Sequence, residues 1–182
     1  RAAADVLQSL AEAHLSACLI GGLAVQRWGE PRATRDVDIS VLAPYGDEGP
    51  VLDVLLAHFS PRRPDARAFA LASRVVLLQV PDGPDVDVAL AAFPFEAEAL
   101  NRASMWEAAS GNHRLPRPAE HLLVYKLVAA RPRDLTDVES IVRRQGRRLD
   151  VNLIRQWGRE FAELKEDPDL LRPFEQALEH VR

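Results

Sequence analysis

The chain has little cysteine and few aromatic side chains: one cysteine among 182 residues, and 6% aromatics. A single cysteine, Cys18, excludes an intramolecular disulfide and is compatible with a reducing compartment. With so few aromatics, the core must be built mainly from leucine, valine and alanine. The sequence also lacks an apolar run of the roughly 20 residues that a membrane span needs, and no signal peptide is visible. We therefore expect a cytoplasmic protein that does not enter a membrane.

Positive charge is not in excess either, because the formal net charge is −4. A chain of this charge is no general polyanion binder, so any contact with nucleic acid requires a local basic patch. One arginine cluster could supply it, either as a complement to a helix C-terminus or as an RNA contact. Its members flank Gly146: Arg143, Arg144, Arg147 and Arg148.

Hydrophobic periodicity and turn signals predict an α+β chain, with strands confined to the first ~115 residues and helices after them. We expect helices at 2–16, 23–28, 48–59, 94–104, 118–130, 134–145, 150–161 and 169–181. We expect strands at 17–20, 36–42, 71–80 and 85–91, a loop at 61–68, and two short strands within 105–116.

The stretch from Leu19 to Leu42 carries the first functional signal. Gly21 and Gly22 stand between an apolar strand and a helix. Without side chains, they let an anion approach the backbone N–H groups at the helix N-terminus, where the dipole favours negative charge. This arrangement predicts a phosphate-binding turn.

The strand after that helix carries two carboxylates, Asp36 and Asp38, on one face, since side chains alternate along a strand. Val37, Ile39 and Val41 then form the opposite, buried face. Adjacent carboxylates repel each other unless a cation lies between them. Oxygen ligands favour a hard divalent cation, for which we expect Mg²⁺, with Mn²⁺ as the alternative.

A hairpin turn at 81–84 leads into a further acidic strand. Asp85 lies at the turn, where aspartate commonly makes local hydrogen bonds. Asp87 lies between Val86 and Val88 within the strand, where an unpaired carboxylate would be costly. We therefore predict Asp87 as the third metal ligand.

Polar residues elsewhere have two interpretations each. Arg32, Thr34 and Arg35 form either a solvated loop or a triphosphate contact, because arginine binds phosphate oxygens bidentately. Lys126, in an apolar helix, either extends to solvent at the helix edge or binds phosphate. Asp134 and Asp137 have the spacing of an N-cap and N3 pair, and capping alone would explain both.

The ordered set of Gly21-Gly22, Asp36-Val37-Asp38 and Asp87 resembles the nucleotidyltransferase superfamily, which has the polymerase-β-like fold. Further motifs narrow the resemblance to the AbiEii/AbiGii toxin-like nucleotidyltransferases, the toxin half of some bacterial toxin–antitoxin and phage-defence pairs. These motifs are the run RATRDVDI and the later Lys126, Arg133-Asp134 and Asp137. The resemblance covers roughly residues 15 to 145.

The resemblance implies a nucleotidyltransferase-like mixed β-sheet flanked by helices. It places the catalytic core at 1–115 and a helical region, packed on that core, at 116–182. It implies Mg²⁺-dependent transfer of a nucleoside monophosphate from an NTP to a hydroxyl of RNA, tRNA, a protein or a small molecule, with an antitoxin as partner if the chain is a toxin. The implied catalytic residues are Asp36, Asp38, Asp87 and Lys126, and the implied nucleotide-binding residues are Gly21, Gly22, Arg32, Thr34, Arg35, Asp134 and Asp137.

Other functions fit parts of the pattern. A glycosyltransferase uses Asp-x-Asp to hold a metal–sugar nucleotide, but it would need neither the upstream glycines nor Asp87. A non-catalytic protein of the same fold would bind an NTP or a partner without turnover. The aspartates could also serve only as turn and cap residues of an α/β domain.

Overall fold

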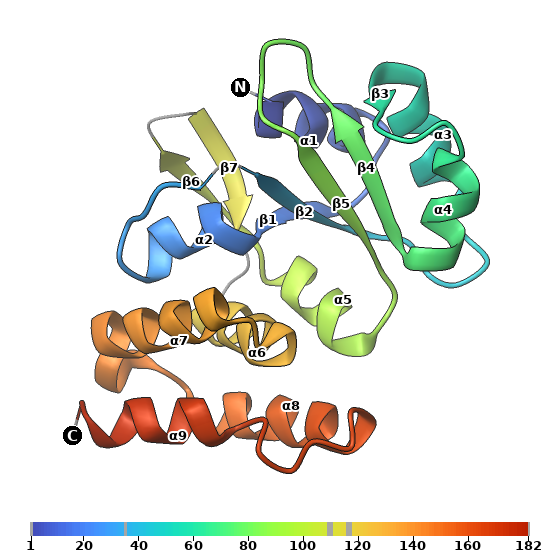
Figure 1. The fold of residues 1–182 in the computed structure, drawn as a ribbon. Helices are drawn as coiled ribbons and strands as arrows, with labels where there is room; N and C mark the ends of the chain where they lie inside the picture. Colours follow the sequence, from blue (N-terminus) through green and yellow to red (C-terminus); the bar gives the residue numbers. More distant parts are fainter. Residues whose placement is uncertain (1, 35, 109–110, 116–117, 182) are drawn as a thin grey trace. The chain divides into compact units, whose positions relative to one another are not determined.

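The computed structural model describes residues 2–34, 36–108, 111–115 and 118–181 (Figure 1). The chain divides into two compact units. The first, here called the sheet unit, comprises Arg1–Leu23 and Ala33–Pro116. The second, the helical unit, comprises Ala24–Arg32 and Arg117–Arg182. The sequence did not predict that residues 24–32 would group with the C-terminal helices.

A five-stranded mixed sheet organises the sheet unit, in the order β1-β2-β5-β4-β3. Strands β2 and β5 are parallel, and the other neighbours are antiparallel. A separate antiparallel pair is formed by β6 and β7. The strands are β1 (Ala17–Ile20), β2 (Val37–Leu42), β3 (Ser60–Pro61), β4 (Val75–Gln79), β5 (Val86–Ala91), β6 (Ser104–Ala108) and β7 (Gly111–Leu115).

Helices precede, connect and follow these strands. Helix α1 contacts β1, β2 and α3, whereas α5 contacts β2. Helix α2 is shared, since its first three residues belong to the sheet unit and the rest to the helical unit. The helices are α1 (Ala2–Glu12), α2 (Gly21–Trp28), α3 (Gly49–His58), α4 (Ala66–Ser73) and α5 (Pro94–Asn101).

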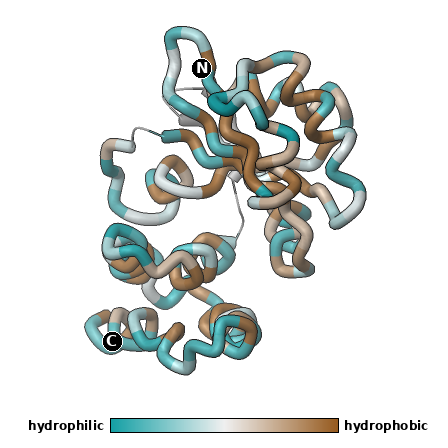
Figure 2. The backbone as a smooth tube through the Cα atoms, turned by 45° about the vertical axis from the view of Figure 1, so that its right-hand side comes forward, coloured by the Kyte–Doolittle hydropathy of each residue, from teal (hydrophilic) through white to brown (hydrophobic). Residues whose placement is uncertain are grey.

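One face of the sheet is entirely apolar, as the alternation in β2 predicted. Val37, Ile39 and Val41 are at most 4% exposed, and Val86 and Val88 of β5 are fully buried beside them. Figure 2 shows these strands mostly in brown. Burial of such side chains contributes about 1.5–3 kcal/mol each, so this face fixes the register of β2 against β5.

The other face of the sheet is divided between a packed end and a polar end. Cys18, Ala91 and Leu100 form a buried cluster in which Leu100 comes from α5. Asp38 and Asp87 lie at the opposite end of the same strands and remain partly exposed. Helix α5 thus covers one end of this face and leaves the carboxylates accessible.

The helical unit is built from α6 (Ala119–Ala129), α7 (Pro132–Gln145), α8 (Val151–Leu164) and α9 (Arg172–Glu179). Helix α6 contacts α7 and α8, and α7 contacts α9. Brown and teal alternate along α8 and α9 in Figure 2, as expected of helices with one apolar face. None of the described helices is long and apolar enough to cross a bilayer.

Residues 24–32 are held in the helical unit by polar contacts from α7. The Gln145 side chain donates to the Trp28 carbonyl at 2.7 Å, and Arg144 donates to the Gly29 carbonyl. The Glu30 amide donates to the Ser140 hydroxyl at 3.4 Å. A Cβ at Gly29 would lie 2.5 Å from that hydroxyl oxygen, so this close approach requires glycine.

The arginine cluster around Gly146 is used mainly within the fold. Arg144 donates to carbonyls at the C-terminal end of α2, and Arg148 donates to the carbonyls of Arg144 and Gln145. Arg143 pairs with Glu30 at 3.2 Å. The carbonyl contacts of Arg144 and Arg148 are of the helix-end kind. The RNA-contact interpretation of the cluster stays a prediction.

Three expected elements need correction. Residues 61–68 are not all loop and 71–80 are not all strand, because Ala66–Ser73 form α4 and β4 begins only at Val75. Alanine-rich α4 buries Ala66 and Ala70, and Arg74 ends it in a left-handed conformation (φ 61°). Helix α7 begins at Pro132 and not at Asp134, since proline suits the first helical position.

Candidate active site

Two of the three predicted metal ligands are direct neighbours in the sheet. Asp38 of β2 and Asp87 of β5 are register partners in a parallel pair. Partners in adjacent strands project on the same face, and the hydrophobic partners Val37 and Val86 take the other. The register therefore brings together two carboxylates that are 49 positions apart in the sequence.

Gly21 lies directly against the first of these carboxylates. A Cβ built on Gly21 would lie 1.8 Å from Oδ2 of Asp38, and the backbone has φ +64°. Glycine is thus required twice, for space and for a left-handed conformation. Helix α2 begins at this residue, so its N-terminus lies beside Asp38. The predicted phosphate-binding turn stays a prediction.

The sequence alternation placed Asp36 within the strand, and this prediction is wrong. Asp36 precedes β2, in an exposed bend. Strand pairing begins only at Val37, whose amide donates to the Asp85 carbonyl at 3.1 Å. The Thr34 hydroxyl donates to the Asp36 carbonyl at 3.2 Å and so shapes the approach to β2. Arg35, a predicted nucleotide contact, lies outside the described residues.

The electrostatics of Asp87 show that four carboxylates influence one another. Burial raises the pKa of Asp87 most, and Arg62 acts against it. The charges of Asp38, Asp36 and Asp85 add to the rise, and the net pKa lies above the ordinary aspartate value. Negative charge is therefore concentrated around Asp87, the register partner of Asp38.

This donor set fits a hard divalent cation in chemistry. Asp36, Asp38 and Asp87 offer only oxygen ligands, and their mutual repulsion is what such a cation would relieve. Within the described part of the chain, no three His, Cys, Asp or Glu side chains are already arranged as a metal cage. The assignment of the three aspartates as ligands stays a prediction.

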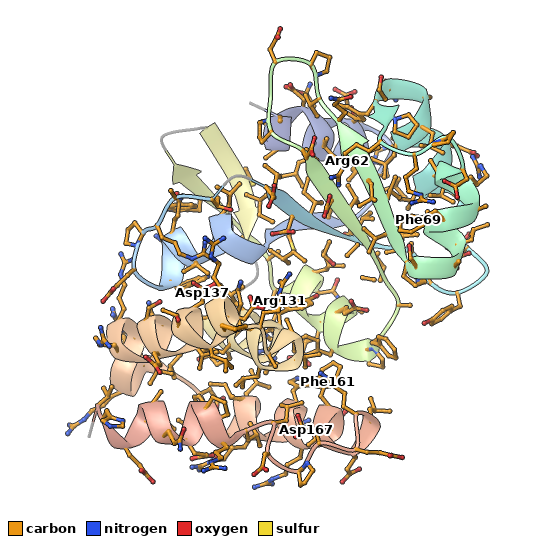
Figure 3. The ribbon with its side chains drawn as sticks, in the orientation of Figure 1. Arg62, Phe69, Arg131, Asp137, Phe161 and Asp167 are labelled. Atoms are coloured by element: carbon orange, nitrogen blue, oxygen red, sulfur yellow. The ribbon has the colours of Figure 1, made fainter. Side chains whose placement is uncertain are left out.

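A residue that the sequence did not suggest contacts the acidic group. Arg62 donates through Nη1 to Asp85 Oδ2 at 3.1 Å and through Nη2 to Asp87 Oδ1. Figure 3 labels Arg62 beside β4 and β5. The sequence placed Arg62 in a basic loop, and nothing in its local pattern indicated which carboxylates it would reach.

The other predicted site residues form a buried ion network in the helical unit. Lys126 Nζ lies 2.8 Å from Asp134 and 2.9 Å from Asp137. Arg32 pairs with Asp137 through Nε and Nη2 at 2.7 and 2.8 Å, and Arg131 pairs with Asp134 at 2.7 Å. Figure 3 labels Arg131 and Asp137 at this network.

Two sequence interpretations of this network are wrong. Lys126 is only 5% exposed, so it does not extend to solvent from the helix edge. Asp134 and Asp137 are the third and sixth residues of α7 and not a cap pair, because Arg131 is the N-cap. These charges satisfy one another, which explains them structurally without a ligand. Their predicted catalytic and nucleotide-binding roles stay predictions.

The cations of the network set the ionisation of both aspartates. Burial acts to raise the pKa of Asp134, but hydrogen bonds and charge from Arg131 and Lys126 outweigh it. Burial likewise acts to raise the pKa of Asp137, and Arg32 and Lys126 outweigh it. Both pKa values therefore lie below the ordinary aspartate value.

The structure thus gathers the predicted residues into two groups. Gly21, Gly22, Asp36, Asp38 and Asp87 belong to the sheet unit. The helical unit holds Arg32, Lys126, Asp134 and Asp137.

Comparison with solved structures reveals a shared fold. The chain matches the solution structure of the antibiotic-resistance factor ANT(2'')-Ia with a TM-score of 0.55, at 17% identity, over 88% of this chain and 91% of that one. A "putative nucleotidyltransferase from H. pylori" matches at 0.46 and 14% identity, covering 95% and 80%. JHP933 from Helicobacter pylori matches at 0.43 and 14%, covering 97% and 78%. The predicted fold class, a nucleotidyltransferase-like mixed sheet flanked by helices, is confirmed.

No protein-family model matches the sequence, and no curated protein matches it either.

Substituting Gly21 tests the close approach to Asp38. Gly21→Ala is expected to lower the free energy of unfolding and displace the carboxylate, because the new methyl group overlaps Oδ2. Gly46→Ala is the matched control, since Gly46 also has positive φ (+86°) but nothing within 4 Å of its Cβ position. The control should cost about 1–2 kcal/mol, and Gly21→Ala at least about 1 kcal/mol more. Equal urea unfolding curves for the two variants would contradict the clash.

Removing one acid of the buried network should be costly. Asp137→Ala leaves Lys126 and Arg32 without this partner, and we expect a loss of about 3–5 kcal/mol at pH 7. Asp53→Ala, which breaks the exposed pair with Arg67, should change stability by less than about 0.5 kcal/mol. The measurement is denaturant unfolding.

The same variants predict a pH dependence. A lowered folded-state pKa contributes stability that is present above the unfolded value, about 3.9, and is lost as pH falls through the folded value. The difference between wild type and Asp137→Ala should therefore shrink below about pH 4. A difference that stays constant from pH 7 to pH 3 would show that ion pairing is not its source.

Proposed function

We propose that this chain is a nucleotidyltransferase that moves a nucleoside monophosphate from an NTP to an acceptor hydroxyl. The observation that carries the proposal is the seating of Asp38 against Gly21, beside its register partner Asp87. This places acidic side chains next to a helix N-terminus that can receive phosphate. The fold shared with ANT(2'')-Ia is consistent with this chemistry.

Asp36, Asp38 and Asp87 are the residues that would hold Mg²⁺, or Mn²⁺ in its place. When bound, such ions neutralise phosphate charge and stabilise the attacking and leaving oxygens of an in-line displacement. The backbone N–H groups after Gly21 and Gly22 would donate hydrogen bonds to the triphosphate oxygens and stabilise their negative charge. Gly21 leaves the space that the Asp38 carboxylate fills, so this carboxylate lies next to the N-terminus of α2.

The transfer step forms one bond and breaks another at the α-phosphorus. The acceptor oxygen bonds to phosphorus, and pyrophosphate leaves with the electrons of the broken P–O bond. The acceptor proton needs a base, and the carboxylate of Asp87, on the same face as Asp38, would receive it. Asp38, seated against Gly21, would hold its orientation throughout.

The finer assignments belong to the same proposal. Membership of the AbiEii/AbiGii group and a toxin role rest on the sequence motifs, which include the Lys126 network. In this proposal Lys126 would bind pyrophosphate only if its ion pairs with Asp134 and Asp137 were broken. The acceptor that we would test first is a hydroxyl-bearing antibiotic, since the structure with the shared fold is an antibiotic-resistance factor.

Labelling with NTPs tests the proposed activity. Each of the four α-³²P-labelled NTPs is incubated with Mg²⁺ and, in separate reactions, with hydroxyl-bearing antibiotics, total RNA or a protein extract. Wild type should label one acceptor class, and the double variant Asp36→Ala plus Asp38→Ala should reduce labelling by at least about 100-fold. Asp82→Asn, a change at an exposed turn position, is the control and should label normally. Equal labelling by wild type and the double variant would refute the mechanism.

Asp87→Asn should separate activity from stability. Because the folded-state pKa of Asp87 is raised, its charge opposes folding at pH values above that pKa. The neutral variant should lose labelling. Its free energy of unfolding should equal that of wild type or exceed it by less than about 1 kcal/mol. A clear loss of stability would mean that Asp87 is a structural residue.

A further inference from the structure

A row of side chains crosses the aspartate face of the five-stranded sheet. Ile20, Asp38, Asp87 and Leu77 are successive register partners from β1 to β4. The backbone amide of Arg62 donates to the Leu77 carbonyl at 2.9 Å, which extends the pairing of β3 with β4 by one residue. Arg62 therefore stands at the far end of the row that contains both aspartates.

From this position the Arg62 side chain spans β4 and reaches β5. One nitrogen of its guanidinium contacts Asp85 and the other contacts Asp87. The Arg62 side chain is 28% exposed and that of Asp87 40% exposed, so the contact is open to solvent and to exchange. A forked guanidinium can keep one carboxylate while it releases the other.

We propose that Arg62 competes with the divalent cation for Asp87, holding this carboxylate in place until the cation binds and then remaining on Asp85. This inference rests on the proposed function and adds a positioning residue to it. Two positive groups beside one carboxylate repel each other, so the guanidinium weakens cation binding. Asp85 has a role in this scheme as the anchor that keeps Arg62 nearby after release.

The competition predicts an unusual direction of change. If Arg62 supported the site only structurally, its removal would loosen Asp87 and weaken cation binding. If Arg62 competes, its removal strengthens binding of the divalent cation, because Asp87 is freed from the guanidinium and the site loses a positive charge. The two roles therefore differ in the sign of the effect.

Titration of Mn²⁺ into the nucleotide-free protein, with free Mn²⁺ followed by electron paramagnetic resonance, measures this sign. Arg62→Gln should bind Mn²⁺ about three- to tenfold more tightly than wild type at pH 7.5. Arg62→Lys keeps the charge and should remain near wild type. Arg63→Gln is the matched control, because Arg63 pairs with Asp65 and contacts the Phe69 ring instead. Its Kd for Mn²⁺ should equal that of wild type.

Two further variants locate the bound ion. Mn²⁺ binding should be lost in both Asp38→Asn and Asp87→Asn if the ion occupies the aspartate face. If that holds but Arg62→Gln binds Mn²⁺ no more tightly than wild type, the competition is refuted and the proposed function stands. If wild type binds no Mn²⁺, or binds it independently of these aspartates, the metal site fails and the competition fails with it.

Discussion

Burial of the apolar face of the parallel β2–β5 pair is the constraint on which the rest of the sheet unit depends. The buried side chains of this face fix the register of β2 against β5, and this register places Asp38 beside Asp87. Folding energy from the buried valines thus maintains an electrostatic arrangement that is unfavourable by itself. Arg62 offsets part of that cost, and an incoming cation would offset more.

In the helical unit, by contrast, opposite charges are paired. Lys126 and Arg32 are paired with Asp134 and Asp137 at hydrogen-bonding distances, and all but Arg32 are nearly inaccessible to solvent. Here the paired cations outweigh burial and keep both acids ionised, whereas on the sheet burial and neighbouring carboxylates raise the pKa of Asp87 and favour its protonation. Sequence motifs do not distinguish the two situations, because they do not show which cations reach each aspartate.

Much of the sheet unit could be predicted from local pattern. Alternation gave the buried face of β2, and the glycine pair marked the start of α2. The parallel pairing that brings Asp87 beside Asp38 is non-local, so no local pattern specifies it, although Asp87 was predicted as the third metal ligand. Arg62 could not be predicted, because its contact with Asp87 depends on the pairing of a two-residue strand with β4. Asp36 was misplaced because alternation indicates which face a side chain takes but not where pairing begins.

The division of α2 between the two units limits how the chain can be truncated. The backbone leaves the sheet unit after Leu23, returns at Ala33 and leaves again after Pro116. Ala24 and Val25 are fully buried, and Arg32 is bonded to Asp137, so deleting the C-terminal helices would strip the covering from a segment far upstream. The sheet unit therefore has no clean excision point, and a graft of the helices onto another scaffold would have to carry two separate stretches of sequence.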